Sequence, residues 1–269
     1  MLWALLGFIG IFVGAFGTLI GAAGGFLLVP ILLFLYPQET PAIITSITLT
    51  VAFFNALSGS IAYGHLRRID YRSGLLFSLA GVPGAIIGAS ITAFLSRGMF
   101  QTIFGAALLL AAAYLLVRPQ TKYSPGAVRP GNTSRQIADA QGNVFNYSFS
   151  TVRGMAIAFA VGLISGLLGI GGGIIHVPAL TQLLAFPTHI ATATSHFLLA
   201  ITTFAAVMVH IVSGTFTAGI RRAAVLSAGA VIGAQFGARL SQKVPATWII
   251  RLLAIGLALV AVRLLIAPF

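Results

Sequence analysis

The chain has 269 residues, of which 58% are hydrophobic and only 7% are charged. A soluble domain carries about 25% charged residues, so this composition excludes a water-covered globular domain and indicates that the lipid bilayer is the solvent. The apolar runs are about 20 residues or longer, which suits spanning helices and exceeds the length of barrel strands. The sequence therefore predicts an all-α polytopic membrane protein.

Charged and reactive residues are scarce. The three acidic residues, Glu39, Asp70 and Asp139, all fall in segments that read as loops. A membrane interior without carboxylates argues against a cation site built on Asp or Glu and against a carboxylate proton relay. The net charge of +12 comes from basic residues at the ends of apolar runs, so it indicates the positive-inside bias rather than a nucleic-acid partner. The absence of cysteine excludes disulfides and thiolate metal sites. We expect no metal and no cofactor.

Four apolar runs make up the first half. They cover about residues 2–36, 42–63, 73–95 and 99–117. The first of them begins without a basic segment, so we interpret it as a membrane helix rather than a cleaved signal. Residues 118–153 then lose every apolar period and are rich in Pro, Gly, Asn, Ser and Arg. This composition predicts a flexible polar linker.

The second half repeats the first. Its runs cover about residues 154–186, 190–213, 223–240 and 247–266. The predicted organisation is therefore a first transmembrane repeat at 1–117, a polar cytoplasmic linker at 118–153 and a second transmembrane repeat at 154–269.

A glycine-rich stretch inside the first run of each half carries the strongest signal of duplication. A shift of 148 residues aligns Gly14 with Gly162, Gly21 with Gly169, Gly24-Gly25 with Gly172-Gly173, and Val29-Pro30 with Val177-Pro178. A glycine within a helix costs about 1 kcal/mol relative to alanine. Consecutive glycines followed by proline therefore predict a break in the helix. The more widely spaced glycines of Gly84-x-x-x-Gly88 and Gly233-x-x-x-Gly237 instead indicate close packing between helices.

The breaks leave two topologies open. If each interrupted run crosses once, the bundle has about eight helices, four in each repeat, with a glycine-broken first helix. If each run counts as two crossings, the halves form an inverted repeat of five plus five. Both place eleven basic residues on the linker side and four on the other, so the positive-inside rule makes the linker cytoplasmic without separating them. Length favours four plus four, because 154–168 and 174–186 are each too short to span.

Each break would create a helix N-terminus inside the membrane. Such an end has free backbone N–H groups and roughly half a positive charge, so it attracts anions. Secondary transporters use one broken helix from each repeat to hold substrate near the middle of the membrane. The candidate substrate-binding residues are Gly21, Gly24, Gly25, Thr45, Ser46, Gly169, Gly171, Gly172, Gly173, His176, Thr194, Ser195 and His196.

Simpler roles compete for the polar candidates. Serine and threonine hydroxyls commonly bond back to their own helix. His196 follows His189 by seven residues and precedes His210 by fourteen, so the three share one helix face, where a histidine can line a path or simply pack. Asn55 lies alone in an apolar run, which indicates a polar link between helices.

The duplicated pattern Gly-x-x-x-Gly-x-x-Gly-x-Gly-Gly-Gly-x-x-x-Val-Pro-x-Leu, with Thr-Ser downstream, resembles the sulfite exporter TauE/SafE family of membrane permeases, also called the toluene sulfonate uptake permease family. The resemblance covers the chain outside the linker. The copy at Gly162–Leu180 fits better, because Ala23 stands where the second copy has Gly171. The resemblance implies an inner-membrane carrier for sulfite, sulfoacetate or another sulfonate.

These observations favour a secondary transporter for a small sulfur-containing anion, with no catalytic residues. A passive anion channel would use the same site. An intramembrane serine hydrolase, with Ser165 or Ser195 as nucleophile and a histidine as base, is the enzymatic alternative, although no nucleophile-elbow pattern surrounds either serine. The expected partners are the anion and the lipid bilayer, with a homodimer as one open assembly.

Overall fold

The computed structural model describes residues 2–117, 132–241, 254–255 and 258–262. Most of the last predicted run, at about 247–266, lies outside these ranges. Within the described part, the helices are α1 (Leu2–Ile20), α2 (Gly25–Leu35), α3 (Pro41–His65), α4 (Tyr71–Thr92), α5 (Arg97–Val117), α6 (Thr151–Leu168), α7 (Gly173–Gln182), α8 (Thr188–Val212) and α9 (Phe216–Leu240). The predicted all-α polytopic fold is confirmed.

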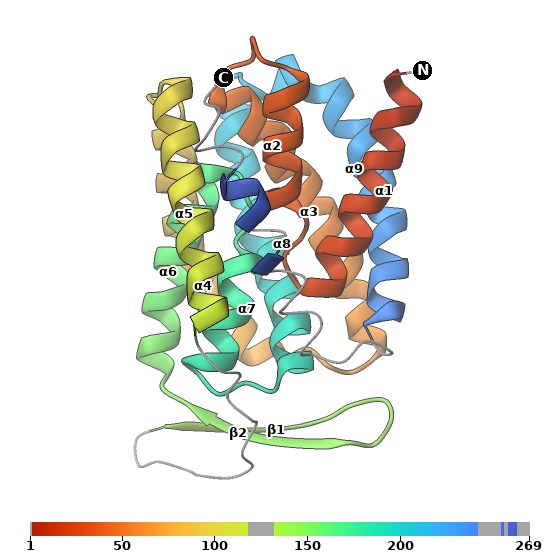
Figure 1. The fold of residues 1–269 in the computed structure, drawn as a ribbon. Coiled ribbons are helices and arrows are strands. Elements are labelled where there is room, and N and C mark those ends of the chain that lie inside the picture. The colour runs from red at the N-terminus through yellow and green to blue at the C-terminus, as the bar shows by residue number, and fades with distance from the viewer. Residues whose placement is uncertain (1, 118–131, 242–253, 256–257, 263–269) are drawn as a thin grey trace.

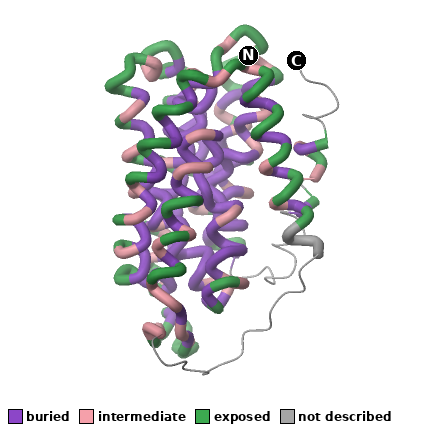
Figure 2. The backbone as a smooth tube through the Cα atoms, turned by 90° about the vertical axis from the view of Figure 1, so that its left-hand side faces the viewer, coloured by how far each residue is buried: buried purple, intermediate pink, exposed green. Residues whose placement is uncertain are grey.

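Six of these helices, α1, α3, α4, α6, α8 and α9, are long and apolar enough to cross a membrane. Their outward faces carry large apolar side chains such as Phe8, Leu79 and Phe236, each at least 60% exposed. The centre of the bundle is buried (Figure 2). An apolar coat around a buried core is the surface that a lipid-embedded protein presents.

The glycine-rich stretches break the helices at the predicted places, but the chain does not continue across. A Cβ atom added to Gly24 would lie 2.5 Å from the carbonyl oxygen of Val13. Eleven residues of straight helix would separate these positions by about 16 Å. The chain therefore reverses after α1, and α2 returns to the end of the bundle where α1 begins (Figure 1).

The second copy also reverses. A Cβ atom on Gly172 would lie 3.2 Å from the Cβ atom of Ser165, a separation of about 10 Å along a straight helix. Phe186, shortly after α7, packs on Tyr147 of the hairpin that precedes α6, at 4.5 Å between ring centroids. Both ends of the α6–α7 pair thus lie at the hairpin end. In the described residues, each broken run is a re-entrant pair and not the single discontinuous crossing that length favoured.

The two halves are intertwined. Helix α1 packs along α9 and α6 packs along α4, while α3 and α8 contact each other near the centre. Small residues permit the close approach: a Cβ on Gly84 would overlap the carbonyl oxygen of Phe159, and one on Gly233 would overlap that of Ile11. The packing role predicted for these two glycines is confirmed. The first and second halves therefore form one bundle.

The predicted linker is partly ordered, contrary to the expectation of a flexible segment. Strands β1 (Thr133–Ala138) and β2 (Val144–Phe149) form an antiparallel hairpin in which Thr133 pairs with Phe149 and Ala138 with Val144. The hairpin lies across the end of the bundle opposite to the start of α1 (Figure 1). This element was not predicted because its alternation of apolar and polar residues is short and mostly polar. Residues 118–131 of the predicted linker lie outside the described ranges.

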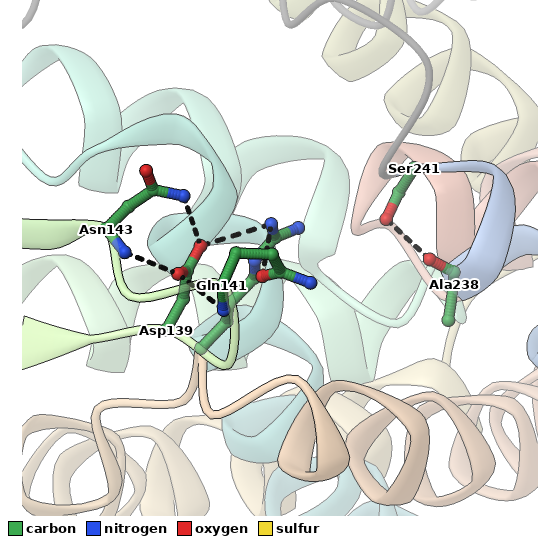
Figure 3. Close-up of polar contacts among 6 residues, drawn as sticks. Asp139, Gln141, Asn143, Ala238 and Ser241 are labelled. Carbon is green, nitrogen blue, oxygen red and sulfur yellow. Dashed lines mark hydrogen bonds and ion pairs between the residues drawn. The ribbon is translucent and has the colours of Figure 1, made fainter.

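Buried charges attach the hairpin to the loop between α3 and α4. Asp139 forms an ion pair with Arg68 at 3.3 Å and accepts hydrogen bonds from the backbone N–H groups of Gln141 and Asn143 (Figure 3). Burial alone would raise the pKa of the Asp139 carboxyl, but the hydrogen bonds from Asn143, Arg68 and Gln141 outweigh it and lower the pKa. The ionised carboxylate therefore stabilises the docked hairpin.

Candidate substrate-binding site

The residues between each re-entrant pair form two similar turns. The first glycine turn comprises residues 21–25 and the second comprises residues 169–173. Gly24 and Gly172, which precede α2 and α7, have φ angles of 75° and 76°. Such left-handed backbone favours glycine. Ala23 also adopts φ 52° where the second turn has Gly171 at 74°. Ala23 in place of a glycine thus leaves the backbone of the first turn left-handed, as at Gly171.

The two glycine turns touch each other inside the bundle. A Cβ atom on Gly25 would lie 2.8 Å from the carbonyl oxygen of Gly169, and one on Gly173 would overlap the carbonyl oxygen of Gly21. Each contact is the counterpart of the other under the 148-residue shift. All residues of both turns are buried. The structure therefore brings together Gly21, Gly24, Gly25, Gly169, Gly171, Gly172 and Gly173, as the sequence pattern predicted.

Two helix N-termini begin at this contact. Neither α2 nor α7 has a side-chain cap in the described structure. The first N–H groups of a helix have no partner within it. Leu27 and Leu28 donate to the Gly24 carbonyl, and Ile175 and His176 donate to the Gly172 carbonyl, so the donors without a helix partner are the N–H groups of residues 25–26 and 173–174. Backbone donors and the positive ends of two helix dipoles thus lie close together in a buried region that holds no carboxylate.

Three consecutive residues of α8 connect different parts of the protein. The Thr194 hydroxyl accepts a hydrogen bond from the backbone N–H of Asp70 at 3.0 Å. The Ser195 hydroxyl donates to the carbonyl of Gly21, in the first glycine turn, at 3.3 Å. The His196 ring nitrogen Nε2 lies 3.3 Å from the Thr18 hydroxyl. Of the three, Ser195 directly contacts a glycine turn, and Thr194 binds the loop between α3 and α4, to which the hairpin is attached.

The equivalent residues of the first half are less engaged. The Thr45 hydroxyl donates to carbonyls of its own helix at Pro41 and Ala42, and the Ser46 hydroxyl donates to Ile43. These hydroxyls use their single proton within α3, which is the simpler role expected of such residues. Thr45 nevertheless lies against the second glycine turn, since a Cβ on Gly169 would be 3.0 Å from its Cα. The two halves therefore contribute unequally.

Two polar side chains beside this region have atoms without a hydrogen-bond partner. His176, on the first turn of α7, is 1% exposed, and neither of its ring nitrogens has a hydrogen-bond partner in the described residues. Asn55 on α3 is fully buried, and its Nδ2 atom is also unpartnered. A buried polar atom without a partner costs about 1–3 kcal/mol. These atoms are candidates to bind a ligand or water that enters the bundle.

Sequence reasoning missed part of the polar core. The Thr18 hydroxyl donates to Asn55 Oδ1 at 2.6 Å, and the Tyr63 hydroxyl donates to the Thr18 carbonyl at 2.8 Å. Asn55 thus links α3 to α1, as expected for an isolated amide in a membrane helix. Thr18 had no counterpart in the other half, where Gly166 stands. Its position three residues before Gly21 was the signal available.

The histidines of α8 do not form one path. His196 and His210 are buried and His189 is only partly buried. His210 lies near the other end of α8, where its Nδ1 atom is 3.1 Å from the Thr215 hydroxyl. In the described residues, no serine hydroxyl is hydrogen-bonded to a histidine ring, so the pair that a serine hydrolase needs is not assembled.

A cavity of about 550 Å³ opens at the end of the bundle where α1 begins. Its lining includes Thr40, Thr92, Ser96, Arg97 and Thr215. Arg97 is partly committed, because its guanidinium donates to the carbonyls of Leu33, Tyr36 and Glu39 at the end of α2. The lining also holds the Glu39 carboxylate, so the cavity carries one acidic and one basic side chain and does not by itself favour an anion.

Comparison with known proteins agrees with this arrangement. The family model described as "Sulfite exporter TauE/SafE" matches residues 6–264. A probable membrane transporter protein YunE of Bacillus subtilis is 33% identical over 275 residues, which cover 98% of each chain. A probable membrane transporter protein of Xylella fastidiosa (strain 9a5c) is 30% identical over 186 residues, covering 69% of this chain and 64% of that one.

A more distant relative is probable membrane transporter protein MJ0441 of Methanocaldococcus jannaschii, 22% identical over 256 residues, covering 91% of this chain and 88% of that one. No solved structure matches the chain. The similarity thus reaches from bacteria to an archaeon, and each of these relatives is named a transporter.

Proposed function

The chain belongs to the sulfite exporter TauE/SafE family and is a multi-pass membrane transporter rather than an enzyme, and from this premise we propose that it is a secondary transporter for a small sulfur-containing anion. Sulfite, sulfoacetate and other sulfonates are the proposed substrate class. The single observation that carries the proposal is the contact between two uncapped helix N-termini, α2 and α7, in a bundle core without carboxylates.

The proposed binding site uses backbone donors first. N–H groups at the starts of α2 and α7 would hold the oxygens of the anion, as broken helices do in other secondary transporters. Ser195 positions the first glycine turn through its bond to Gly21, and His176 supplies ring nitrogens that are unpartnered in this state. Thr45, Ser46, Thr194 and His196 border the site rather than complete it.

The proposed topology is the inverted one. Each repeat would contain a re-entrant pair followed by three crossings, so that the halves form a five-plus-five inverted repeat across residues 1–117 and 154–269. The described geometry supports this, because α1–α2 enters from one end of the bundle and α6–α7 from the hairpin end (Figure 1). An inverted pair places equivalent helix ends face to face, which suits alternating access.

We assign the hairpin end to the cytoplasm and the membrane to the cell inner membrane. Six described arginines lie at the hairpin end and three at the other, which supports this orientation. They are Arg67, Arg68, Arg72, Arg135, Arg153 and Arg239 against Arg97, Arg221 and Arg222. In this state the polar cavity opens on the outer side, while the docked hairpin covers the inner end. A homodimer is compatible with this arrangement.

Flux measurements test the proposal. Purified protein in liposomes should exchange labelled sulfite or sulfoacetate across the membrane, with saturation and with inhibition by unlabelled sulfonates. Liposomes without protein provide the baseline. If correctly folded protein moves neither sulfite, thiosulfate, sulfoacetate nor an alkyl sulfonate, the proposed substrate class is wrong. Counterflow, in which trapped anion drives uphill uptake of label, separates a carrier from a passive channel, because a channel gives none.

A further inference from the structure

Helices α1, α3 and α8 enclose a polar cluster in which a proton can be held. The cluster comprises Thr18, Asn55, Tyr63 and His196, all buried. The His196 ring has Nδ1 at 3.3 Å from the carbonyl of Thr192 and Nε2 at 3.3 Å from the Thr18 hydroxyl. Space for the ring exists because residue 59 is glycine: a Cβ there would overlap His196 Cδ2 and lie 3.0 Å from Nε2.

The hydrogen bonds around His196 fit a doubly protonated ring in the orientation described. The Thr192 carbonyl can only accept, so Nδ1 must carry a proton to bond with it. The Thr18 hydroxyl donates its single proton to Asn55 Oδ1 at 2.6 Å, so it presents a lone pair to Nε2. Nε2 must then also carry a proton. Both nitrogens donate only when the ring is an imidazolium cation.

One rearrangement makes the same cluster fit a neutral ring. If the Asn55 amide turns over, its NH₂ group donates to the Thr18 oxygen, and the Thr18 proton is free to point at Nε2. His196 then needs a proton only on Nδ1. In the orientation described, the Nδ2 atom of Asn55 has no partner, so turning the amide over removes no bond made by that atom. The bonds between Asn55, Thr18 and His196 can therefore form in two patterns that differ by one proton, and one atom of the Asn55 amide is unpartnered in each.

The cluster is connected to the proposed site by a short stretch of α1 and by a hydrogen bond from α8. Thr18 lies three residues before Gly21, and Ser195, the neighbour of His196, donates to the Gly21 carbonyl. The Tyr63 hydroxyl holds the Thr18 carbonyl at the end of α1. A change in the protonation of His196 would therefore act on the first glycine turn from both sides. The residue of the first half that corresponds to His196 is Ile47, so the protein has this polar cluster in one half only.

Other titratable groups around His196 are few in the described residues. On α3, Tyr63 touches the ring, with centroids 5.5 Å apart. On the α4 side, Asp70 meets the neighbouring Thr194 through its backbone N–H, while its carboxylate bonds Ser73 and Tyr147 and lies 3.7 Å from Arg135. Helix α7 carries His176, and α9 carries the exposed Arg239. Helix α1 contributes no charged residue to this contact.

Building on the proposed function, we propose that His196 carries the proton that couples transport, one proton moving in the same direction as each anion. The proton enters His196 from the side on which the anion binds, and the resulting cation stabilises the anion at the adjacent turn. The proton leaves His196 on the other side as the anion departs. No bond other than N–H is made or broken. Thr18 and Asn55 are positioning residues for this step.

The experiment uses reconstituted full-length protein and a pH gradient at zero membrane potential. Methanesulfonate is the probe, because its single negative charge does not change near neutral pH. Coupling to one proton predicts about tenfold accumulation at steady state for each pH unit, since a tenfold ratio is equivalent to one unit. Steady-state accumulation depends on stoichiometry and not on rate, so a slower variant can still be judged.

His196→Gln should lower the accumulation to the onefold value of an uncoupled carrier, whereas His210→Gln, a second buried histidine of α8, should keep the tenfold value. Thr18→Val should lower accumulation with His196 intact. Accumulation unchanged in His196→Gln would overturn the proposal.

A second measurement does not depend on any variant. A trapped pH indicator should report one proton crossing with each methanesulfonate that wild-type protein moves down its gradient. Net downhill movement of methanesulfonate by wild-type protein without proton movement overturns the coupling role while leaving the proposed function standing. If wild-type protein exchanges neither methanesulfonate nor any other sulfur anion, the proposed function fails, and the coupling role fails with it.

Discussion

Replacing Gly173 by alanine is a direct test of the contact between the two glycine turns. The added methyl group would overlap the carbonyl oxygen of Gly21, so the turns must move apart or twist. Overpacking of this kind costs about 1–3 kcal/mol, which a folded bundle survives. A displacement of about 1 Å at a functional site can lower a rate by roughly 100-fold. We expect Gly173→Ala to fold and to lose most of its anion exchange.

A matched control separates this effect from general destabilisation. Gly233→Ala introduces the same kind of overlap, with the carbonyl oxygen of Ile11, at the packing contact between α1 and α9. Both variants should lower the midpoint of thermal unfolding by similar amounts. Exchange per folded molecule should fall by about 10- to 100-fold in Gly173→Ala and by less than about threefold in Gly233→Ala. Equal losses in both variants, or full exchange in Gly173→Ala, would refute the reasoning.

Three further predictions address single side chains. Ser195→Ala removes the hydroxyl that holds the first glycine turn, whereas Ser46→Ala removes a hydroxyl that bonds only within α3. Ser195→Ala should therefore reduce exchange at least threefold more than Ser46→Ala. Equal effects would contradict the asymmetry between the halves. Arg97→Gln removes charged hydrogen bonds to the carbonyls of Leu33 in α2 and Glu39 in the loop that follows, and it should cost about 2 kcal/mol of unfolding free energy, measured by denaturation. An unchanged denaturation midpoint would count against these contacts. The pKa of Asp139 is lowered from 3.8 by folding, so its carboxylate stabilises the docked hairpin above about pH 4, and this stabilisation is lost as the pH falls through the lower folded value. Asp139→Asn should cost about 3 kcal/mol at pH 7 by leaving Arg68 buried without its ion-pair partner, and limited proteolysis should then cut the hairpin faster; cleavage at the wild-type rate would show that the pair does not hold it.

Composition and duplication predicted much of the fold. The scarcity of charge indicated a membrane protein, and the apolar runs located helices close to their observed bounds: α6 begins at Thr151 where a run was predicted from about 154. The helix breaks were predicted at the right glycines because consecutive glycines followed by proline destabilise a continuous helix. All three carboxylates lie in loops or turns, as expected.

The reversal of the chain at those glycines could not be predicted from length. Residues 2–20 are long enough to span the membrane alone and residues 154–168 are not, so length alone predicted different topologies for the two copies. The φ angles of a few residues decide whether the chain continues or reverses after each break. Ala23 adopts a left-handed backbone that an alanine disfavours. The surrounding contacts decide that conformation, and a single sequence does not contain them.

The site was predicted in its backbone and only partly in its side chains. The glycines of both halves meet as the pattern indicated, because symmetry alone pairs equivalent breaks. The hydroxyl pairs did not divide as symmetry suggests: Ser195 reaches the opposite half, whereas Ser46 bonds its own helix. Thr18 was missed because it has no equivalent at Gly166, and a residue present in one copy leaves no repeat signal.

Binding of the anion at the glycine turns is the central claim, and a crystal structure with selenite tests it most directly. Selenite resembles sulfite, and its anomalous scattering marks its position independently of the protein. We expect selenium beside the turns at residues 21–25 and 169–173, with its oxygens about 3 Å from N–H groups at the starts of α2 and α7. Selenium bound only beside Arg97 in the outer cavity, with the turns unoccupied, would contradict the claim.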